Sequence, residues 1–457
     1  MRLELYNCDF AIQYLSIFED LFYLLKTKKL ETQSRKFLVV SKWGDSLDLA
    51  YKIQQEGNEI LMYIQDKASR EVGYGFVKKT NSWEKYIDWA DVIIFDYTGF
   101  GEIADQLRAR GKRVFGGSKY TDLLELDRNF GQDELKKHGV KTIPSKEFFS
   151  FTEAIQFIKK NPDTYVIKPC GETQELKQLL FVGNDEAGAD IIRMLQAYEK
   201  TWGDAFGAFQ IQRKVKGVEI AFSGFFNGKK FIKPLNVSFE HKKLFPNELG
   251  VSTGEMGTSM FWAKDSVIFE KTLQKLEKTL AEHNFRGHLD INSIVNGNGI
   301  YPLEFTSRFG YPQVYIQQDG LLEPIGTMIY KIASGIDFDL NVKKGFQVGA
   351  YIVVPPFPFE DKKSFELFSK DSVIVFKKPI KEGVHPIQVK KINDQWLVTG
   401  NTGIVLLVTG TGITMREAQK TMYNRISNII INNSYYRNDI GNRWSEESDK
   451  LLSWGML

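Results

Sequence analysis

The sequence feature that most limits the possible fold lies between residues 36 and 120. Short apolar runs alternate there with helical stretches. Four strands are expected, at 36–41, 59–64, 91–96 and 113–117. Helical stretches lie between them, one at Leu47–Gln55 and another around Ile103 and Leu107. Strands that alternate with helices of about 10–15 residues are typical of βαβ units around a parallel sheet. Residues 36–120 are therefore predicted to form a small doubly wound α/β domain.

Residues after 120 follow another pattern, in which helices and strands of different lengths are mixed. Helices are expected near 121–138, at 151–160, at about 186–200, at 267–283 and at 414–431. Strands are expected at 164–169, 208–215 and 218–227, and in a hairpin formed by HLDINSIV and IYPLEFTS. From residue 346 onward the chain is rich in strands.

Composition excludes several classes of protein. Sixty Lys and Arg against 57 Asp and Glu give a net charge of +3 in 457 residues. This charge is too small for a protein whose main function is to bind nucleic acid or an anionic membrane. The two cysteines, Cys8 and Cys170, cannot form a disulfide framework or a Cys-based zinc site, and the five His form no HExxH motif. We expect small-molecule partners, no nucleic acid or membrane, and a monomer or homodimer.

The N-terminal stretch Phe10–Leu25 is apolar but carries Glu19 and Asp20. It is too short and too charged to cross a bilayer or to act as a secretory signal. Its apolar spacing is that of an amphipathic helix. We therefore expect a helical extension packed on the body of a cytoplasmic protein.

Lys168, in VIKP, ends a strand that is expected to be buried. A Lys that snorkels from a strand end is the simpler explanation for this residue alone, but its ammonium also suits a phosphate. Further along, the strand that ends at Gln212 leads through Val215 to Glu219. A strand that enters a linker exposes N–H and C=O groups able to pair with an adenine edge. A carboxylate just beyond can accept hydrogen bonds from ribose hydroxyls, so these residues predict a nucleotide site.

Residues 290–308, DINSIVNGNGIYPLEFTSR, contain a strong hairpin signal in the turn NGNG. Alternation places Asp290 and Asn292 on one face of the first strand, and Glu304 and Thr306 on one face of its partner. Such oxygen ligands suit Mg²⁺, which usually takes one or two carboxylates plus phosphates. A polar solvent face is the alternative, but PLEF places Glu304 among apolar neighbours, where an unpaired carboxylate is costly. Arg308 is positioned to stabilise a phosphoryl group in transfer.

LEFTSRFGYPQ (303–313) resembles the LEFNxRFGDPE segment of the phosphoribosylamine–glycine ligase family, also called glycinamide ribonucleotide synthetase, whose members are ATP-grasp enzymes. FEHKKLFPNELGVSTGEMG (239–257) resembles that family's QDHKR…GPNTGGMG run. Shorter matches are VFGGS (114–118) to VFGPS, HGVKTIP (138–144) to YGIPTA and YRNDIG (436–441) to YRxDIG. The matches keep their order between residues 36 and 445.

The resemblance implies an ATP-grasp fold of the α/β class, α+β overall, with an N-terminal doubly wound α/β domain and a C-terminal β-rich domain. The expected divisions are a helical extension (1–35), the α/β domain (36–120), the ATP-grasp region (121–345, with a lid at about 150–228), the β-rich domain (346–445) and a tail (446–457). The implied reaction uses ATP with Mg²⁺ or Mn²⁺. ATP phosphorylates a carboxylate, and an amine attacks the acyl phosphate to give an amide, ADP and phosphate.

The resemblance also implies roles for individual residues, which are assigned to the positions of this chain that match the family's motifs. Arg308 and Lys168 are the expected catalytic residues, and the expected metal ligands are Glu304, Asn292 and Asp290. The expected ATP-binding residues are Arg128, Lys168, Lys177, Gln212, Val215 and Glu219. The expected substrate loop, Ser252–Gly257 with the segment before it, contributes His241, Lys242, Ser252, Thr253, Gly254 and Gly257.

Three segments depart from the family pattern. The family's Asn, two residues after the metal-binding Glu, is Thr306 here, a weaker Mg²⁺ ligand for which Asn292 or Asp290 is expected to compensate. The Gly- and Lys-rich lid loop reads CGETQELKQ (170–178) and has one Gly, although Lys177 is still expected to reach phosphate. SKWGDS (41–46) stands where the family's GGGREH follows the first strand.

The altered turn SKWGDS predicts a different amine substrate. Several glycines let backbone N–H groups approach a phosphate at a helix N-terminus, whereas Trp43 and a single Gly44 cannot do so in the same way. Asp45 and Asp48 repel a phosphate, and an indole beside carboxylates suits an amine with a flat or apolar body. In the simpler interpretation, Trp43 packs against the lid and Asp45 caps the helix.

Three interpretations follow. The leading one is an ATP-dependent carboxylate–amine ligase with an altered amine site. The alternative is glycinamide ribonucleotide synthetase of purine biosynthesis, its N-terminal site rebuilt with other residues. The third is a nucleotide-binding protein that has lost catalysis, because Thr306 and the lid loop both depart. Glu304, Lys168 and Arg308 together argue against the third.

Overall fold

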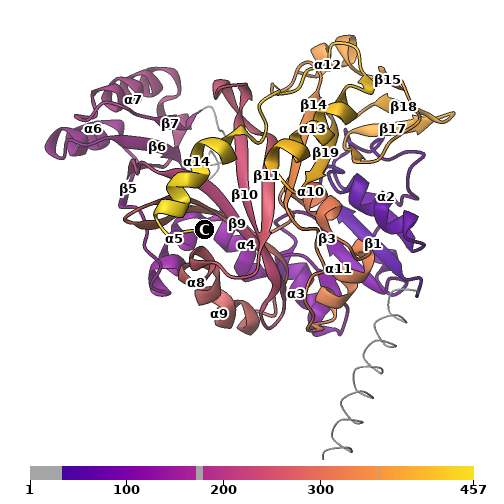
Figure 1. Cartoon of the computed structure of the whole chain (residues 1–457). Coiled ribbons are helices and arrows are strands. Elements are labelled where there is room, and N and C mark those ends of the chain that lie inside the picture. The colour runs from indigo at the N-terminus through magenta and orange to yellow at the C-terminus, as the bar shows by residue number, and fades with distance from the viewer. Residues whose placement is uncertain (1–32, 171–178, 360) are drawn as a thin grey trace, which may run out of the picture.

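The fold is that of a computed structural model, which describes residues 33–170, 179–359 and 361–457 (Figure 1). The amphipathic helix expected within residues 10–25 and the phosphate contact expected of Lys177 lie outside the described residues. Among the helices described, none is long and apolar enough to cross a membrane.

The N-terminal sheet forms as predicted, with four parallel strands in the order β2–β1–β3–β4. Its strands are β1 (Lys36–Ser41), β2 (Glu59–Ile64), β3 (Val92–Phe95) and β4 (Val114–Phe115), and its helices are α2 (Leu47–Gln55) and α3 (Gly101–Ala109). β4 is shorter than predicted because Gly116 leaves β3 and bridges to Arg286. This bridge joins the N-terminal sheet to the central sheet.

The central sheet has eight antiparallel strands in the order β13–β12–β9–β10–β11–β14–β19–β16. Their bounds are β9 (Val218–Asn227), β10 (Phe231–Phe245), β11 (Leu249–Ala263), β12 (Arg286–Asn296), β13 (Gly299–Thr306), β14 (Phe346–Val353), β16 (Val384–Pro386) and β19 (Ile404–Gly412). The long β10–β11 hairpin was not predicted. β9 is buried along almost its whole length because α11 (Ile325–Ala333) and α14 (Asn442–Ser453) both pack on it.

A smaller antiparallel sheet, β5–β8–β6–β7, lies at the left of Figure 1, away from the N-terminal sheet. Its strands are β5 (Ser145–Phe148), β6 (Tyr165–Pro169), β7 (Phe181–Val182) and β8 (Phe209–Arg213), and its helices are α6 (Phe151–Lys160) and α7 (Ala189–Thr201). It has a hydrophobic core of its own, which includes Phe206, Phe209 and Ile211. This unit is built on the helices and strands predicted for 151–215.

The C-terminal strands do not form a sheet separate from the strands of residues 121–345, because β14, β16 and β19 continue the central sheet. A further sheet, β17–β18–β15–β20, is made of β15 (Val373–Phe376), β17 (Val389–Ile392), β18 (Gln395–Val398) and β20 (Ile429–Ile430). α12 (Lys362–Phe368) and α13 (Met415–Ile426) belong to the same region. Most of the expected tail, 446–457, lies in α14. The domain boundaries themselves stay predictions.

Three predicted helices are shorter or divided. The helix expected near 121–138 is two helices, α4 (Lys119–Leu126) and α5 (Arg128–Lys137). Asp127 separates them because its side chain accepts a hydrogen bond from the Phe130 N–H and caps α5. The helix expected at 267–283 divides at Thr272, whose backbone is not helical, into α8 (Val267–Lys271), a 3₁₀ turn and α9 (Glu277–Glu282). The last predicted helix ends at Ile426.

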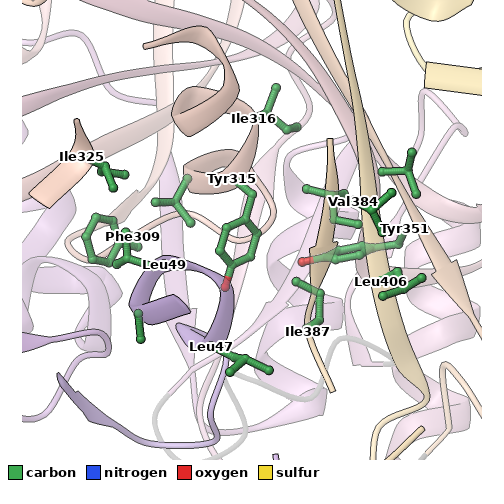
Figure 2. Close-up of a cluster of buried hydrophobic side chains, with 14 of the residues drawn as sticks. Leu47, Leu49, Phe309, Tyr315, Ile316, Ile325, Tyr351, Val384, Ile387 and Leu406 are labelled. Carbon is green, nitrogen blue, oxygen red and sulfur yellow. The ribbon is translucent and has the colours of Figure 1, made fainter. Parts of the chain in front are cut away.

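The largest hydrophobic core ties the N-terminal domain to the C-terminal strands. Figure 2 shows Leu47 and Leu49 of α2, Tyr315 and Ile316 of α10 (Gln313–Gly320), and Tyr351 of β14 within it. The turn after β1 is thereby held against α10 and β14.

Candidate active site

A cavity of about 380 Å³ opens where the β12–β13 hairpin, β10, β11 and the start of α5 meet. The predicted site residues that line it are Arg128, Lys242, Ser252, Thr253, Gly254, Asp290, Asn292, Glu304 and Arg308. The hairpin, the long central strands and the helix after Asp127 thus bring residues distant in sequence to one place.

The β12–β13 hairpin pairs its oxygen groups as predicted. Asp290 lies opposite Thr306, and Asn292 lies opposite Glu304. The side chain of Glu304 is 54% exposed, whereas Asp290 and Asn292 are buried. The prediction that Glu304 lies among apolar neighbours is therefore wrong. Alternation along β13 buries Phe305 and leaves Glu304 on the open side of the strand.

Asn292 is oriented by Glu240 of β10. Its side-chain N–H donates to Glu240 Oε2 at 2.9 Å, while its Oδ1 is buried and has no hydrogen-bond partner among the described residues. A buried acceptor without a partner costs free energy, and a cation would satisfy it. Asn292 Oδ1 and the Glu304 carboxylate therefore fit Mg²⁺, which usually needs few protein ligands beside phosphates. In the described part of the chain, no cluster of three or more His, Cys, Asp or Glu could hold a metal alone.

Asp290 is less suited to a metal than Asn292. Burial first, and then the charge of Glu240, raise the pKa of Asp290 well above its ordinary value. Gln313 of α10 donates a hydrogen bond to its Oδ2 at 3.4 Å. A carboxyl that binds its proton more tightly is a weaker metal ligand, so Asn292, with an Oδ1 that lacks a partner among the described residues, is the better partner for Glu304.

Lys168 stands at the end of β6, where it lies opposite Gln210 of β8. Burial, and then the charge of Arg128, lower the pKa of Lys168 to about 8, against the attraction of Glu304 and Glu219. The predicted phosphate-binding lysine therefore shares one electrostatic environment with the hairpin carboxylate.

Lys242 joins two carboxylates at the cavity. Its Nζ lies 2.7 Å from Glu219 Oε1 and 3.1 Å from Glu240 Oε2. Burial would raise the pKa of Glu219, but Lys242, Arg443 and Lys168 together lower it to about 2. Glu219, the residue predicted for the ribose, is thus ionised and held by a lysine.

Arg128, Gln212 and Val215 occupy different positions around the site. Arg128 begins α5, donates to the Pro169 carbonyl at 2.9 Å, and has its Nη2 3.9 Å from a Glu304 oxygen. Gln212 is buried in β8, and Val215 lies in the connection between β8 and β9. Arg128 therefore reaches the cavity, while Gln212 and Val215 stand where the adenine edge was predicted and do not line it.

Arg308 follows the hairpin and forms a fixed cation in the cavity wall. Its Nε lies 3.2 Å from Glu125 Oε1, and its guanidinium lies 4.6 Å over the ring of Tyr97. Burial opposes its charge, but Glu125 and Tyr97 raise the pKa of Arg308 above its ordinary value. Such a preorganised cation suits developing phosphoryl charge.

The expected substrate loop is not a loop, because Ser252–Gly257 belong to β11. The β10–β11 ladder is irregular here: Lys243 pairs with Ser252, and His241 pairs with Gly257. The extra residues on β11 form a bulge, which re-aims side chains. Ser252, Thr253 and Gly254 line the cavity as a result.

His241 and Gly257, expected in the same substrate segment, do not reach the cavity. His241 is buried, accepts a hydrogen bond from the Gly441 N–H at 3.0 Å, and lies 3.2 Å from Arg437 Nη2. A Cβ on Gly257 would meet the Gly349 carbonyl at 2.5 Å. These two residues join the hairpin to the C-terminal region. This structural role accounts for their presence in the matched segment without a contact to substrate.

The turn after β1 is organised by Asp96 at the end of β3. Asp96 accepts hydrogen bonds from the Lys42 N–H at 3.2 Å and the Ser46 hydroxyl at 2.6 Å. Burial, and then the nearby charge of Asp96, raise the pKa of Asp45 to about 7, against the attraction of Arg308. Ser46 is the N-cap residue of α2. The interpretation of Asp45 as the helix cap is therefore wrong.

Asp48 and Trp43 do not form the expected amine site with Asp45. Asp48 is buried in α2 and accepts hydrogen bonds from His385 Nδ1 at 2.7 Å and Gln318 Nε2 at 3.0 Å. Trp43 packs edge-on against Tyr97, with ring centroids 4.6 Å apart. Asp48 is thus a core residue, and the expectation that it repels a phosphate is wrong.

Sequence analysis missed other polar residues of the cavity, namely Glu240, Glu125, Tyr97, Glu255, Tyr311 and Gln313. Glu240 lies two residues before Lys242, so alternation would have placed both on one face if β10 had been recognised as a strand. Tyr311 and Gln313 stand where the matched LEFNxRFGDPE segment has Asp and Glu. These two differences from the family segment could have identified Tyr311 and Gln313 as candidate site residues.

Residues 126–314 match the ATP-grasp (A) domain of phosphoribosylglycinamide synthetase. The phosphoribosylamine–glycine ligase of Halalkalibacterium halodurans is 26% identical over 354 residues, which are 75% of this chain and 79% of that protein. The protein of the same name from Clostridium acetobutylicum is 24% identical over 435 residues, which are 89% of this chain and 99% of that protein.

Solved structures of other proteins share this fold. The crystal structure of phosphoribosylamine–glycine ligase from Thermotoga maritima has a TM-score of 0.67 and 20% identity, over 89% of this chain and 100% of that chain. The biotin carboxylase domain of 2-oxoglutarate carboxylase from Hydrogenobacter thermophilus, solved with ADP, MgADP and bicarbonate, has a TM-score of 0.61 and 13% identity, over 92% of this chain and 95% of that chain.

Proposed function

We propose, from the match of residues 126–314 to the ATP-grasp (A) domain of phosphoribosylglycinamide synthetase, that the chain is an ATP-dependent ligase that joins a carboxylate to an amine. The observation that carries the proposal is the convergence of cations and metal-ligand oxygens on one cavity. Arg128, Lys242 and Arg308 line it together with Glu304 and Asn292.

The proposed reaction has two steps. An oxygen of the carboxylate attacks the γ-phosphorus of ATP, the bond to the β-phosphate oxygen breaks, and ADP leaves. The amine nitrogen then attacks the acyl carbon, the bond from that carbon to the phosphate oxygen breaks, and the nitrogen loses a proton. Negative charge on phosphate oxygens is stabilised by preorganised cations. Lys168 and Arg128 are the proposed phosphate contacts, and Arg308 is the proposed contact of the acyl phosphate.

Nucleotide binding uses both strand β8 and strand β9 in this proposal. Gln212 and Val215 flank the backbone that pairs with adenine, and Glu219 accepts hydrogen bonds from the ribose. Lys242 holds Oε1 of Glu219 at 2.7 Å, and the second oxygen of that carboxylate is the proposed acceptor of the ribose hydroxyls.

Glu304 and Asn292 are the proposed holders of Mg²⁺ or Mn²⁺, which supplies neutralisation of phosphate charge when bound. Glu240 keeps Asn292 oriented by accepting its N–H. Asn292 lies opposite Glu304, and we assign to it the compensation for the family Asn that Thr306 replaces.

Phosphoribosylamine–glycine ligase is the second candidate, because relatives with that name match most of the chain. The turn after β1 argues against its phosphate-bearing amine. The Lys42 N–H donates to Asp96, and the Gly44 N–H donates to Ser41 Oγ at 2.8 Å. These two donors already have partners in the protein, and Asp45 and Asp96 repel an anion.

The test uses hydroxylamine, a small nucleophile that traps an acyl phosphate as a hydroxamate. The protein is assayed with MgATP, hydroxylamine and a panel of carboxylates that includes glycine, acetate and succinate, and both ADP and hydroxamate are measured. Carboxylate-dependent formation of both supports the proposal. Glycinamide ribonucleotide formed from glycine and fresh phosphoribosylamine would favour the second candidate. Nucleotide binding without ADP release across the panel would refute catalysis and leave the third interpretation. The oligomeric state and the cytoplasmic location stay predictions.

A further inference from the structure

A second cavity, of about 130 Å³, adjoins the larger one. Gly254, Glu255 and Tyr311 line both cavities, so the two are separated by no more than these side chains. The smaller cavity lies between the turn after β1, the bulge of β11 and the C-terminal strands. A group that extends from the reaction site would enter it.

The end of this cavity next to the reaction site is acidic. Asp45 and Glu255 both line it, and Asp45 accepts no hydrogen bond from any described residue. Arg308 attracts Asp45 but is also the ion-pair partner of Glu125, at 3.2 Å. With Asp96 also close to Asp45, these two carboxylates face one arginine that Glu125 shares. A cationic ligand would balance the excess.

Tyr311 gives a second, independent sign of a ligand. Its hydroxyl is buried and has no hydrogen-bond partner among the described residues. Buried polar groups in folded proteins nearly always have a partner. Because Tyr311 lines both cavities, a polar group at their junction would supply one.

The far end of the cavity is apolar. Phe357, Ile387 and Ile404 line it, and Figure 2 shows Ile387 beside the ring of Tyr351. A space of about 130 Å³ holds roughly four water-sized groups of about 30 Å³ each. No Lys, Arg or His is among the described residues that line this cavity, so none of them would pair with a phosphate or a carboxylate.

We propose that the smaller cavity binds the amine substrate of the proposed ligase, as an ammonium at Asp45 and Glu255 with a short, uncharged aliphatic body against Phe357, Ile387 and Ile404. The inference rests on the proposed function. The ammonium proton passes to Asp45 before the nitrogen attacks the acyl carbon. The burial that raises the pKa of Asp45 to about 7 suits it to accept that proton. Trp43, which lines neither cavity, takes no part.

The experiment compares amines with the carboxylate that gives most hydroxamate. Methylamine, n-propylamine, isobutylamine, n-octylamine and O-phosphoethanolamine are supplied in turn, and amide product is measured by mass. The kcat/KM should rise about fourfold per added methylene up to isobutylamine, and fall for n-octylamine and O-phosphoethanolamine. Equal kcat/KM for methylamine and isobutylamine, or preference for O-phosphoethanolamine, would overturn the proposal. If no hydroxamate forms, the proposed function fails instead.

Ile404→Phe tests the apolar end. It should lower the ratio of kcat/KM for isobutylamine to that for hydroxylamine at least tenfold, because the ring fills the cavity. Ile413→Phe is the matched control, since Ile413 is 70% exposed, and it should leave the ratio unchanged. An unchanged ratio in Ile404→Phe would place the amine elsewhere. If that variant fails to fold, the amine series of the parent protein decides alone.

Discussion

Asp45→Asn should stabilise the folded protein at neutral and alkaline pH. The carboxyl of Asp45 is largely buried beside Asp96, and its pKa is raised from 3.8 to about 7. Since each tenfold change in proton affinity corresponds to about 1.4 kcal/mol, the ionised carboxylate costs the folded state about 4 kcal/mol above pH 7. An amide of the same shape does not ionise.

The pH dependence has a definite sign. A carboxyl whose pKa is higher in the folded state contributes fully to stability below its unfolded pKa, and this contribution is lost as pH rises through its folded pKa. The parent protein should therefore lose stability between pH 4 and pH 7 relative to Asp45→Asn. The gain in the variant should be about 2 kcal/mol at pH 5 and about 4 kcal/mol at pH 8.

Equilibrium unfolding in urea, followed by tryptophan fluorescence, measures this gain as a shift in midpoint at constant m value. Asp133→Asn is the control, because Asp133 is 72% exposed and pairs with Lys136 on the surface, so its change should stay under about 0.5 kcal/mol. A variant no more stable than the parent at pH 8, or a gain that does not grow with pH, would refute the reasoning. Loss of isobutylamine turnover in the same variant would identify a residue kept for function at a cost in stability.

Glu304→Gln should abolish ATP turnover and keep the fold, because it removes the charge of a metal ligand with little change in shape. Glu282→Gln is the control, since Glu282 is exposed. Turnover of Glu304→Gln within threefold of the parent would contradict the assignment of Glu304 to the metal. Asn292→Ala should raise the Mg²⁺ concentration needed for half-maximal turnover, and an unchanged requirement would remove Asn292 from the metal site. Lys168→Ala should weaken ATP binding more than adenosine binding, by about 1–3 kcal/mol for one charge-assisted contact, and equal losses measured by calorimetry would place Lys168 away from phosphate. ATP affinity of the parent should also fall as pH rises above 8, where Lys168 loses its proton, and Lys168→Arg should remove that fall.

Sequence patterns were sufficient where the determinants are local. The N-terminal βαβ units and the β12–β13 hairpin depend on apolar runs and a turn of a few residues, so β1, α2 and the Asn292–Glu304 pair were all expected. β10 and β11 were missed because their adjoining ends and the turn between them, KKLFPNELGVSTGE (242–255), are polar and irregular. The two strands are held by pairing with β9 and β14. Long-range pairing of that kind leaves little trace in periodicity.

The roles of individual acids could not be read from spacing. Asp48 and Asp45 lie three residues apart, yet Asp48 reaches His385, which is 337 residues away in the chain, while Asp45 lines a cavity. Glu240 became a candidate only when β10 brought it within 2.9 Å of Asn292. Burial and partners, which decide whether a carboxylate serves the core or a ligand, are properties of the folded chain.

The continuous central sheet makes the C-terminal region part of the same structural unit as the proposed nucleotide site. β11 pairs with β14 over Gly257–Phe261 and Phe346–Ala350, and β14 pairs in turn with β19. A chain cut before Phe346 would leave β11 as an open edge, whose backbone groups can pair with another molecule. Such a fragment, although it keeps every proposed ATP and metal ligand, should aggregate instead of binding nucleotide.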